Sequence, residues 1–347
     1  MGIISKQRNI IIDWLRVIAV FFIVIAHIGI NKHTFLFQFR TFDVVLIFFV
    51  TGLTYSQYGI KYESIFIYIR KRFMRLIVPA LLFSLLYLIL YNLSNFLFFG
   101  IDYSILNYTF ETLTFIGGMG YIWVFLSLFS VSVFNKILTP YFMSKNKKYI
   151  YLFFILFFVV FQFIASRFEF DHFNTLYLIL LYYVFMPIGL YFANLVGIVF
   201  LDLTKRQKIG LTLFLLVICL IYFISTREFN PDSYKYPPLY PYLSYGLLIS
   251  VILFSMLKSL ENSKFLTSTS KIIAYFSKNS LGIYLWHILG VSFMYFLTKI
   301  FGWNNFNVVY YIFSFIIILF IGIILNHLWN SLIYYLRKKL QRRQIYE

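Results

Sequence analysis

Long apolar segments are the feature that most constrains how this chain of 347 residues can fold. A helix needs roughly 20 mainly apolar residues to cross the hydrocarbon core of a bilayer. Backbone groups inside lipid must be hydrogen-bonded internally, which leaves helices and closed barrels as spanning structures. The windows of spanning length therefore predict an all-α, polytopic transmembrane helix bundle of about ten spans. These windows are residues 10–30, 41–58, 76–99, 121–141, 149–166, 176–200, 209–226, 239–257, 279–300 and 306–332.

The composition agrees with a membrane protein. Hydrophobic residues make up 61% of the chain and charged residues only 12%, which is too little polar surface to cover a soluble globule. A single cysteine, Cys219, excludes a disulfide framework and a cysteine metal site, and no metal-ligand motif occurs, so we expect no metal. Short loops and the lack of visible repeats predict one membrane domain over residues 1–347.

The basic residues indicate membrane topology. A net charge of +18 would suggest nucleic acid for a soluble protein, but cytoplasmic loops of membrane proteins are also rich in Lys and Arg. If the N-terminus lies inside, most of the 30 basic residues fall in segments that are then cytoplasmic. We therefore predict that both termini are cytoplasmic, that the basic residues contact membrane lipid, and that nucleic acid is not a partner. The segments are residues 6–8, 61–75, 136–148, 205–208, 258–278 and 337–343.

The first span contains three ionisable side chains, Asp13, Arg16 and His27. His27 follows Arg16 by eleven helical positions, a net rotation of about 20° and a rise of about 16 Å, so both lie on one face. Intramembrane ionisable residues usually face a bundle interior or a wet cavity and mark functional pathways. An imidazole can take a proton from a hydroxyl, which makes His27 a candidate general base. Alternatively, Arg16 reaches the headgroups with Asp13 as its partner, and His27 makes an ordinary interhelical hydrogen bond.

A basic run that contains Arg70, Arg72 and Arg75 precedes the third span. Arg72 and Arg75 have helical i, i+3 spacing and can converge on one anion, and guanidinium groups suit phosphate recognition. The competing interpretation is that the run only follows the positive-inside rule.

Polar residues also form a stripe near the ninth span. Ser280, Tyr284 and His287 follow i, i+4, i+7 spacing and share one helix face, with Trp286 beside them. An aromatic belt and an interhelical hydrogen bond are the structural alternatives. For Asn326 and His327 in the last span we prefer a structural role, and Thr51–Gly52 in the second span permits close helix approach.

Taken together and in this order, these elements resemble the acyltransferase 3 family of bacterial membrane O-acyltransferases. The resemblance covers nearly the whole chain. The sequence departs from the family pattern in two places: Thr51 stands where the family commonly has Ser, and Tyr121 stands where His is frequent. It is carried by Ile12–Arg16 with His27, Phe48–Leu53, Arg72–Arg75, Tyr121–Trp123 and Ser280–His287.

The resemblance implies a function as well as a fold. It implies an O-acetyltransferase of the bacterial plasma membrane that moves acetyl from cytoplasmic acetyl-CoA to a hydroxyl of an extracytoplasmic or lipid-linked glycan. A polysaccharide exporter or flippase and a proton-coupled transporter are the alternatives, since both also use intramembrane charge. The resemblance leaves open which acceptor and acyl group are used, whether transfer is direct or passes through an acyl-enzyme, and what the oligomeric state is. The resemblance implies His27 and Arg16 as the essential pair and Arg72 and Arg75 as the CoA residues. To these we add Asp13 for catalysis, Arg70 for CoA, and Ser280, Tyr284, Trp286, His287, Trp123 and Tyr121 as pocket candidates.

Overall fold

The protein is helical throughout the residues that the structure describes. The computed structural model describes residues 8–32, 34–58, 64–98, 105–116, 122–142, 147–167, 175–301 and 308–346. Every element in these ranges is a helix, and eight helices are long and apolar enough to cross a membrane. The prediction of an all-α polytopic bundle is therefore confirmed.

The chain divides into two compact units. We call Met1–Arg40 with Asn262–Glu347 the terminal unit, and Thr41–Glu261 the central unit. The single domain over residues 1–347 stays a prediction, and each unit is described by itself below.

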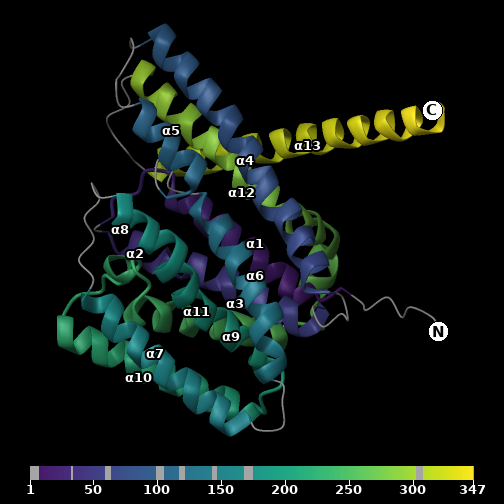
Figure 1. Ribbon diagram of the computed structural model, residues 1–347. Coiled ribbons are helices and arrows are strands. Elements are labelled where there is room, and N and C mark those ends of the chain that lie inside the picture. The colour runs from purple at the N-terminus through teal and green to yellow at the C-terminus, as the bar shows by residue number, and fades with distance from the viewer. Residues whose placement is uncertain are drawn as a thin grey trace. The chain divides into compact units, whose positions relative to one another are not determined.

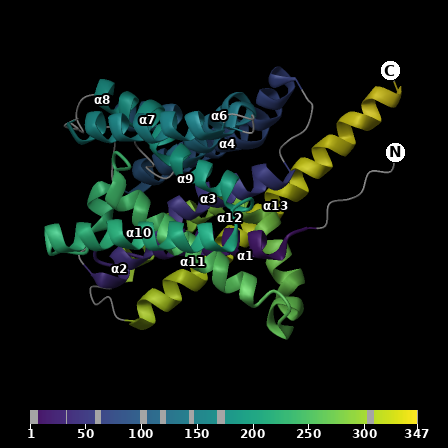
Figure 2. The same ribbon diagram turned by 90° about the horizontal axis from the view of Figure 1, so that it is seen from below.

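The terminal unit is built on three helices, α1 (Ile10–Ala26), α12 (Lys264–Phe301) and α13 (Val308–Tyr346), with the short α2 (Phe35–Phe39) after α1. Helix α12 packs along both α1 and α13. In Figures 1 and 2, α13 is one uninterrupted rod. The apolar core of the unit includes Val24 of α1, Met294 of α12 and Ile318 of α13.

Local sequence sets both ends of α1. The side chain of Asn9 accepts hydrogen bonds from the backbone N–H groups of Ile11 and Ile12, which caps the start of the helix. The helix ends at Ala26 with His27 as its C-cap, and Gly29 follows at φ +87°, a conformation that favours glycine. The predicted span to residue 30 is therefore four residues too long at its C-terminal end, because α1 ends at Ala26 and the chain turns at His27.

The central unit holds the remaining helices. Their core is the closely packed pair α3 and α9, with α6 against α9 and α4 against α6. The elements are α3 (Asp43–Tyr58), α4 (Ile65–Phe98), α5 (Ile105–Thr114), α6 (Trp123–Phe142), α7 (Lys147–Arg167), α8 (Thr175–Leu180), a π-helix (Leu181–Phe185), α9 (Met186–Phe200), α10 (Lys205–Thr226), a 3-10 turn (Pro231–Tyr234) and α11 (Tyr240–Ser259).

Two glycines bring α3 and α9 into backbone contact. A Cβ atom at Gly52 would meet the carbonyl of Asn194, and one at Gly197 would meet the carbonyl of Phe49. The amide of Asn194 also donates to the carbonyl oxygen of Phe48 at 3.2 Å. The close helix approach predicted at Thr51–Gly52 is therefore confirmed.

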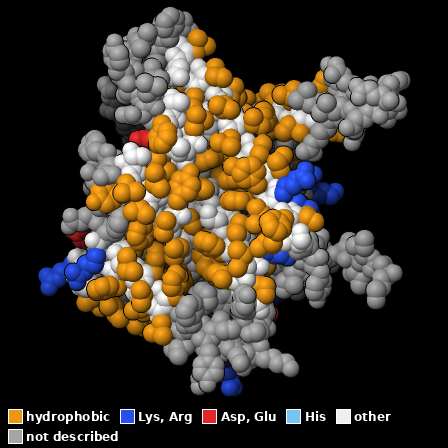
Figure 3. All heavy atoms as spheres, viewed as in Figure 1, with side chains coloured by type: hydrophobic (Ala, Val, Ile, Leu, Met, Phe, Trp, Pro, Cys, Tyr) orange, Lys and Arg blue, Asp and Glu red, His pale blue; other side chains and the backbone are white. Residues whose placement is uncertain are grey.

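Several predicted spans are parts of longer helices. Helix α4 begins at Ile65, not near residue 76, so the basic run Arg70–Arg75 is helical. Helix α12 likewise begins at Lys264, well before residue 279. The coloured side chains in Figure 3 are mostly hydrophobic, as expected for surfaces that face lipid.

Candidate active site

The predicted polar residues of the first span meet the predicted stripe of the ninth in the terminal unit. Arg16 and His27 both contact α12, at positions ten residues apart on that helix. We call this contact the α1–α12 seam. It comprises Asp13, Arg16 and His27 from α1 with Ser277, Ser280, Tyr284 and His287 from α12.

One end of the seam is a charged network around Asp13. Its carboxylate forms an ion pair with Arg8 and accepts a hydrogen bond from Ser277 Oγ at 2.6 Å. Arg16 Nη1 donates to the same serine oxygen at 3.0 Å and lies 3.9 Å from Asp13 Oδ1. Asp13 is buried, so two cations and a hydroxyl offset the cost of removing its charge from water.

The other end of the seam is a pair of histidines. The rings of His27 and His287 have centroids 5.4 Å apart and planes inclined by 34°. His287 is fully buried, and its Nδ1 contacts the backbone carbonyl oxygen of Tyr284. Because a carbonyl only accepts, Nδ1 carries the proton, and Nε2 of the neutral ring is left as an acceptor.

Sequence reasoning identified most of the seam but missed Ser277 and Arg8. Ser277 lies three residues before Ser280 and seven before Tyr284, so it extends the predicted stripe by one helical turn. This helical spacing could have identified Ser277 from the sequence. Arg8 precedes the helix, and nothing in the apolar pattern points to it.

Trp286 does not belong to the seam. Its ring lies 5.7 Å from that of Trp329 on α13, on another face of α12. Ser280 and Tyr284 are buried on α12, and the Tyr284 ring lies 5.4 Å from that of His287. All three residues of the predicted stripe thus lie on the seam and remain pocket candidates, whereas Trp286 packs against α13.

The structural interpretation of Asn326 is supported by a partner on α12. Asn326 Nδ2 donates to Asn279 Oδ1 at 3.1 Å, and Asn330 of α13 donates to the same oxygen at 3.4 Å. His327 is exposed on α13. These amides join α12 to α13 and stand apart from the seam.

The predicted CoA residues lie on α4 in the central unit. Arg72 is half-buried with its guanidinium carbon 5.0 Å from the centroid of the Tyr68 ring. Arg75 is exposed and is an electrostatic neighbour of Arg72, as the i, i+3 spacing predicted. Both guanidinium groups can therefore face one anion.

Trp123, the remaining described pocket candidate, is a buried member of an aromatic cluster in the central unit. Its ring lies 6.1 Å from that of Tyr182 and 5.7 Å from that of Tyr236. Tyr121 lies outside the described residues. Within the described ranges, no group of three His, Cys, Asp or Glu side chains is arranged to hold a metal ion.

Helices long and apolar enough to cross a membrane define an integral membrane protein, and the seam gives its terminal unit a cluster of charged and imidazole groups. The model of the acyltransferase 3 family, an acyltransferase domain, matches residues 9–327, so the chain belongs to this family. Comparison with curated proteins and with solved structures gives no match. The protein is thus a membrane acyltransferase.

Proposed function

We propose that the protein is an O-acetyltransferase that moves an acetyl group from cytoplasmic acetyl-CoA to a hydroxyl of an extracytoplasmic or lipid-linked glycan. The observation that carries the proposal is the His27–His287 ring pair on the seam, one ring of which is held in a defined tautomer. Such a pair can accept and return a proton next to a reacting hydroxyl.

The chemistry follows from the residues of the seam. The acceptor hydroxyl attacks the thioester carbonyl and forms the new C–O bond while its proton passes to His27. The C–S bond then breaks, and the CoA thiolate takes the proton back, so the imidazole returns to its neutral form. Arg16 lies at the other end of the seam, about 16 Å along the helix, and its positive charge positions the acyl donor there.

His287 and Asp13 act as positioning residues in this proposal. His287 Nε2 can accept a hydrogen bond from a protonated His27 or from the acceptor hydroxyl, which favours proton removal. Asp13 and Ser277 hold Arg16 on the α12 side of the helix. An acyl-His27 intermediate would use the same residues, and rapid-quench trapping of radiolabelled acetyl on the protein separates the two routes.

The donor site of the proposal is the arginine pair of α4. Arg72 and Arg75 bind the CoA phosphates, and Arg70 adds charge to the same run. The positive-inside rule favours a cytoplasmic position for this site. Membership of an acyltransferase family favours transfer over the export and proton-transport alternatives.

The histidine pair is tested by glycan acetylation in cells that carry each variant. We expect His27→Ala to lower acetylation by about 10²- to 10⁴-fold, the usual contribution of general acid–base catalysis. His287→Ala should lower it less, because His27 remains. His327→Ala is the matched control, since His327 is exposed on α13 and should leave acetylation unchanged. Normal acetylation in a correctly inserted His27→Ala protein would refute the assignment.

The donor site is tested by binding of acetyl-CoA to the purified protein. We expect saturable binding that is lost when Arg72 and Arg75 are both replaced by Gln. Mass spectrometry of surface glycans in cells with and without the protein then identifies the acceptor and the acyl group. Glycan translocation without acetyl-CoA binding would favour export instead.

A further inference from the structure

A second cluster of polar and charged side chains lies in the central unit, between α4 and α6. At its centre is Tyr68 of α4, which is only 4% exposed. Two cations approach this ring: the Arg72 guanidinium carbon at 5.0 Å and Lys136 Nζ of α6 at 5.6 Å from its centroid. One aromatic ring thus holds positive charges from two helices close together.

The charge of this cluster favours an anion. Arg75 is an electrostatic neighbour of Arg72, so a third cation adjoins the two that lie over the Tyr68 ring. Like charges at short range repel one another, and the repulsion grows where the surroundings exclude water. A multiply charged anion placed between the three cations would relieve it, and a diphosphate has the matching charge.

A buried amide on α6 faces the same region. Four polar residues of α6 fall within an arc of about 100° around the helix axis: Ser132, Asn135, Lys136 and Thr139. Asn135 is 1% exposed, and neither Oδ1 nor Nδ2 has a hydrogen-bond partner among the described residues. Leaving such a group unsatisfied is costly, so this amide calls for a polar partner from outside the described residues.

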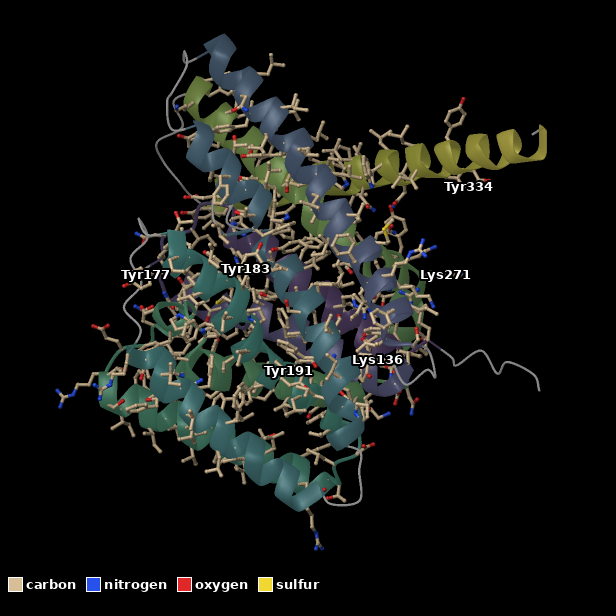
Figure 4. The ribbon with its side chains drawn as sticks, viewed as in Figure 1. Lys136, Tyr177, Tyr183, Tyr191, Lys271 and Tyr334 are labelled. Atoms are coloured by element: carbon tan, nitrogen blue, oxygen red, sulfur yellow. The ribbon has the colours of Figure 1, made fainter. Side chains whose placement is uncertain are left out.

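The neighbours of this arc are also polar. Thr139 lies one turn from Asn135, and Tyr55 on α3 and Tyr191 on α9 are both near it. Tyr55 in turn interacts electrostatically with Arg72. Figure 4 shows the two labelled members, Lys136 and Tyr191, on α6 and α9 of the central unit. Four helices therefore supply polar groups to one region.

We infer that Lys136 joins Arg72 and Arg75 in a three-cation site for a diphosphate group, with Tyr68 holding two of the cations and Asn135 offering its amide to the ligand. The identity of the ligand rests on the proposed function, in which the diphosphate belongs to the acyl donor. A phospholipid headgroup shares the phosphate chemistry, and the experiment separates the two sources.

The experiment measures ligand affinity by calorimetry with the full-length protein in nanodiscs of neutral lipid. The probes are acetyl-CoA and inorganic pyrophosphate. We expect Lys136→Gln and Tyr68→Leu to weaken binding of both probes about tenfold, as loss of a charge-assisted contact does. Tyr68→Phe keeps the ring and should change affinity less than about twofold.

Lys208→Gln is the matched control. Lys208 Nζ also lies over an aromatic ring, 5.0 Å from the centroid of Phe200, in the same unit and on a segment predicted to be cytoplasmic. Equal affinities of Lys136→Gln and Lys208→Gln for both probes would overturn the inference and leave the proposed function standing. Lys136-dependent binding of pyrophosphate without binding of acetyl-CoA would support the inference and contradict the proposed function.

Two further measurements complete the test. We expect Asn135→Leu to raise thermal stability, because it removes an unsatisfied amide from the core. We also expect it to weaken the binding of both probes. Unchanged affinity would show that Asn135 does not belong to the site. Pyrophosphate and acetyl-CoA should still bind when the nanodiscs contain phosphatidylglycerol. If Lys136→Gln changes only the binding of the anionic lipid and neither probe, the site belongs to a headgroup and the inference fails.

Discussion

At the scale of single residues, Asp13 organises the charged end of the seam. Its carboxylate joins Arg8, which precedes α1, to Ser277 of α12, and Arg16 reaches it from one turn along α1. The hydroxyl of Ser277 donates a hydrogen bond to Asp13 and accepts one from Arg16, so this side chain links the two. Removal of either residue breaks at least two of these interactions at once, which is costly.

We therefore predict that Asp13→Asn and Ser277→Ala destabilise the protein. The expected loss is about 1–3 kcal/mol for Asp13→Asn and about 1 kcal/mol for Ser277→Ala. The measurement is thermal unfolding in detergent. Ser268→Ala is the control, because Ser268 is exposed on the same helix and bonds only the carbonyl of Phe265. Equal melting temperatures for Ser277→Ala and Ser268→Ala would contradict the network.

The sequence predicted this residue-scale arrangement only in part. Helical spacing alone aligned Arg16 with His27 and placed Ser280, Tyr284 and His287 on one face. It did not show that the two faces meet, because an apolar pattern identifies a helix and not its neighbour. Trp286 illustrates the limit: it is adjacent to His287 in sequence but packs against Trp329 of α13.

At the scale of helices, the tightest contact described is that of α3 with α9. The absence of side chains at Gly52 and Gly197 lets the two backbones meet, and Gly52 was predictable as a small residue within a span. Its partner Gly197 was not, because one small residue in an apolar run does not reveal which helix it faces. Helix lengths were also underestimated, since the predicted spans omit the ends of α4 and α12 outside the apolar windows.

We predict that Gly52→Ala and Gly197→Ala each destabilise the central unit by about 1–3 kcal/mol, the usual cost of overpacking. The added Cβ atom meets backbone atoms, which cannot move aside as a flexible side chain can. Gly210→Ala on α10 is the control, because no atom lies within 4 Å of its Cβ position. There, alanine should be neutral or stabilising by up to about 1 kcal/mol. A Gly52→Ala protein as stable as Gly210→Ala would show that the helices are not in contact.

At the scale of the whole molecule, the distribution of basic residues predicts an orientation that can be measured directly. The single cysteine, Cys219, allows a cysteine-free background by Cys219→Ala. Arg206→Cys in that background should react with a membrane-impermeant maleimide only after the membrane is opened, and Glu228→Cys should react in intact cells. The reverse pattern would place the termini outside and would move the proposed donor site away from cytoplasmic CoA.

The backbone contact between α3 and α9 has a mechanical consequence. Two helices that touch through their main chains have no layer of side chains on which to slide, so they should move as one rigid piece. The neighbouring α4 is joined to α6 in part through the long, flexible side chains of Arg72 and Lys136 around Tyr68. If the central unit opens to admit a bulky ligand, we therefore expect α4 to move while α3 and α9 keep their relative positions.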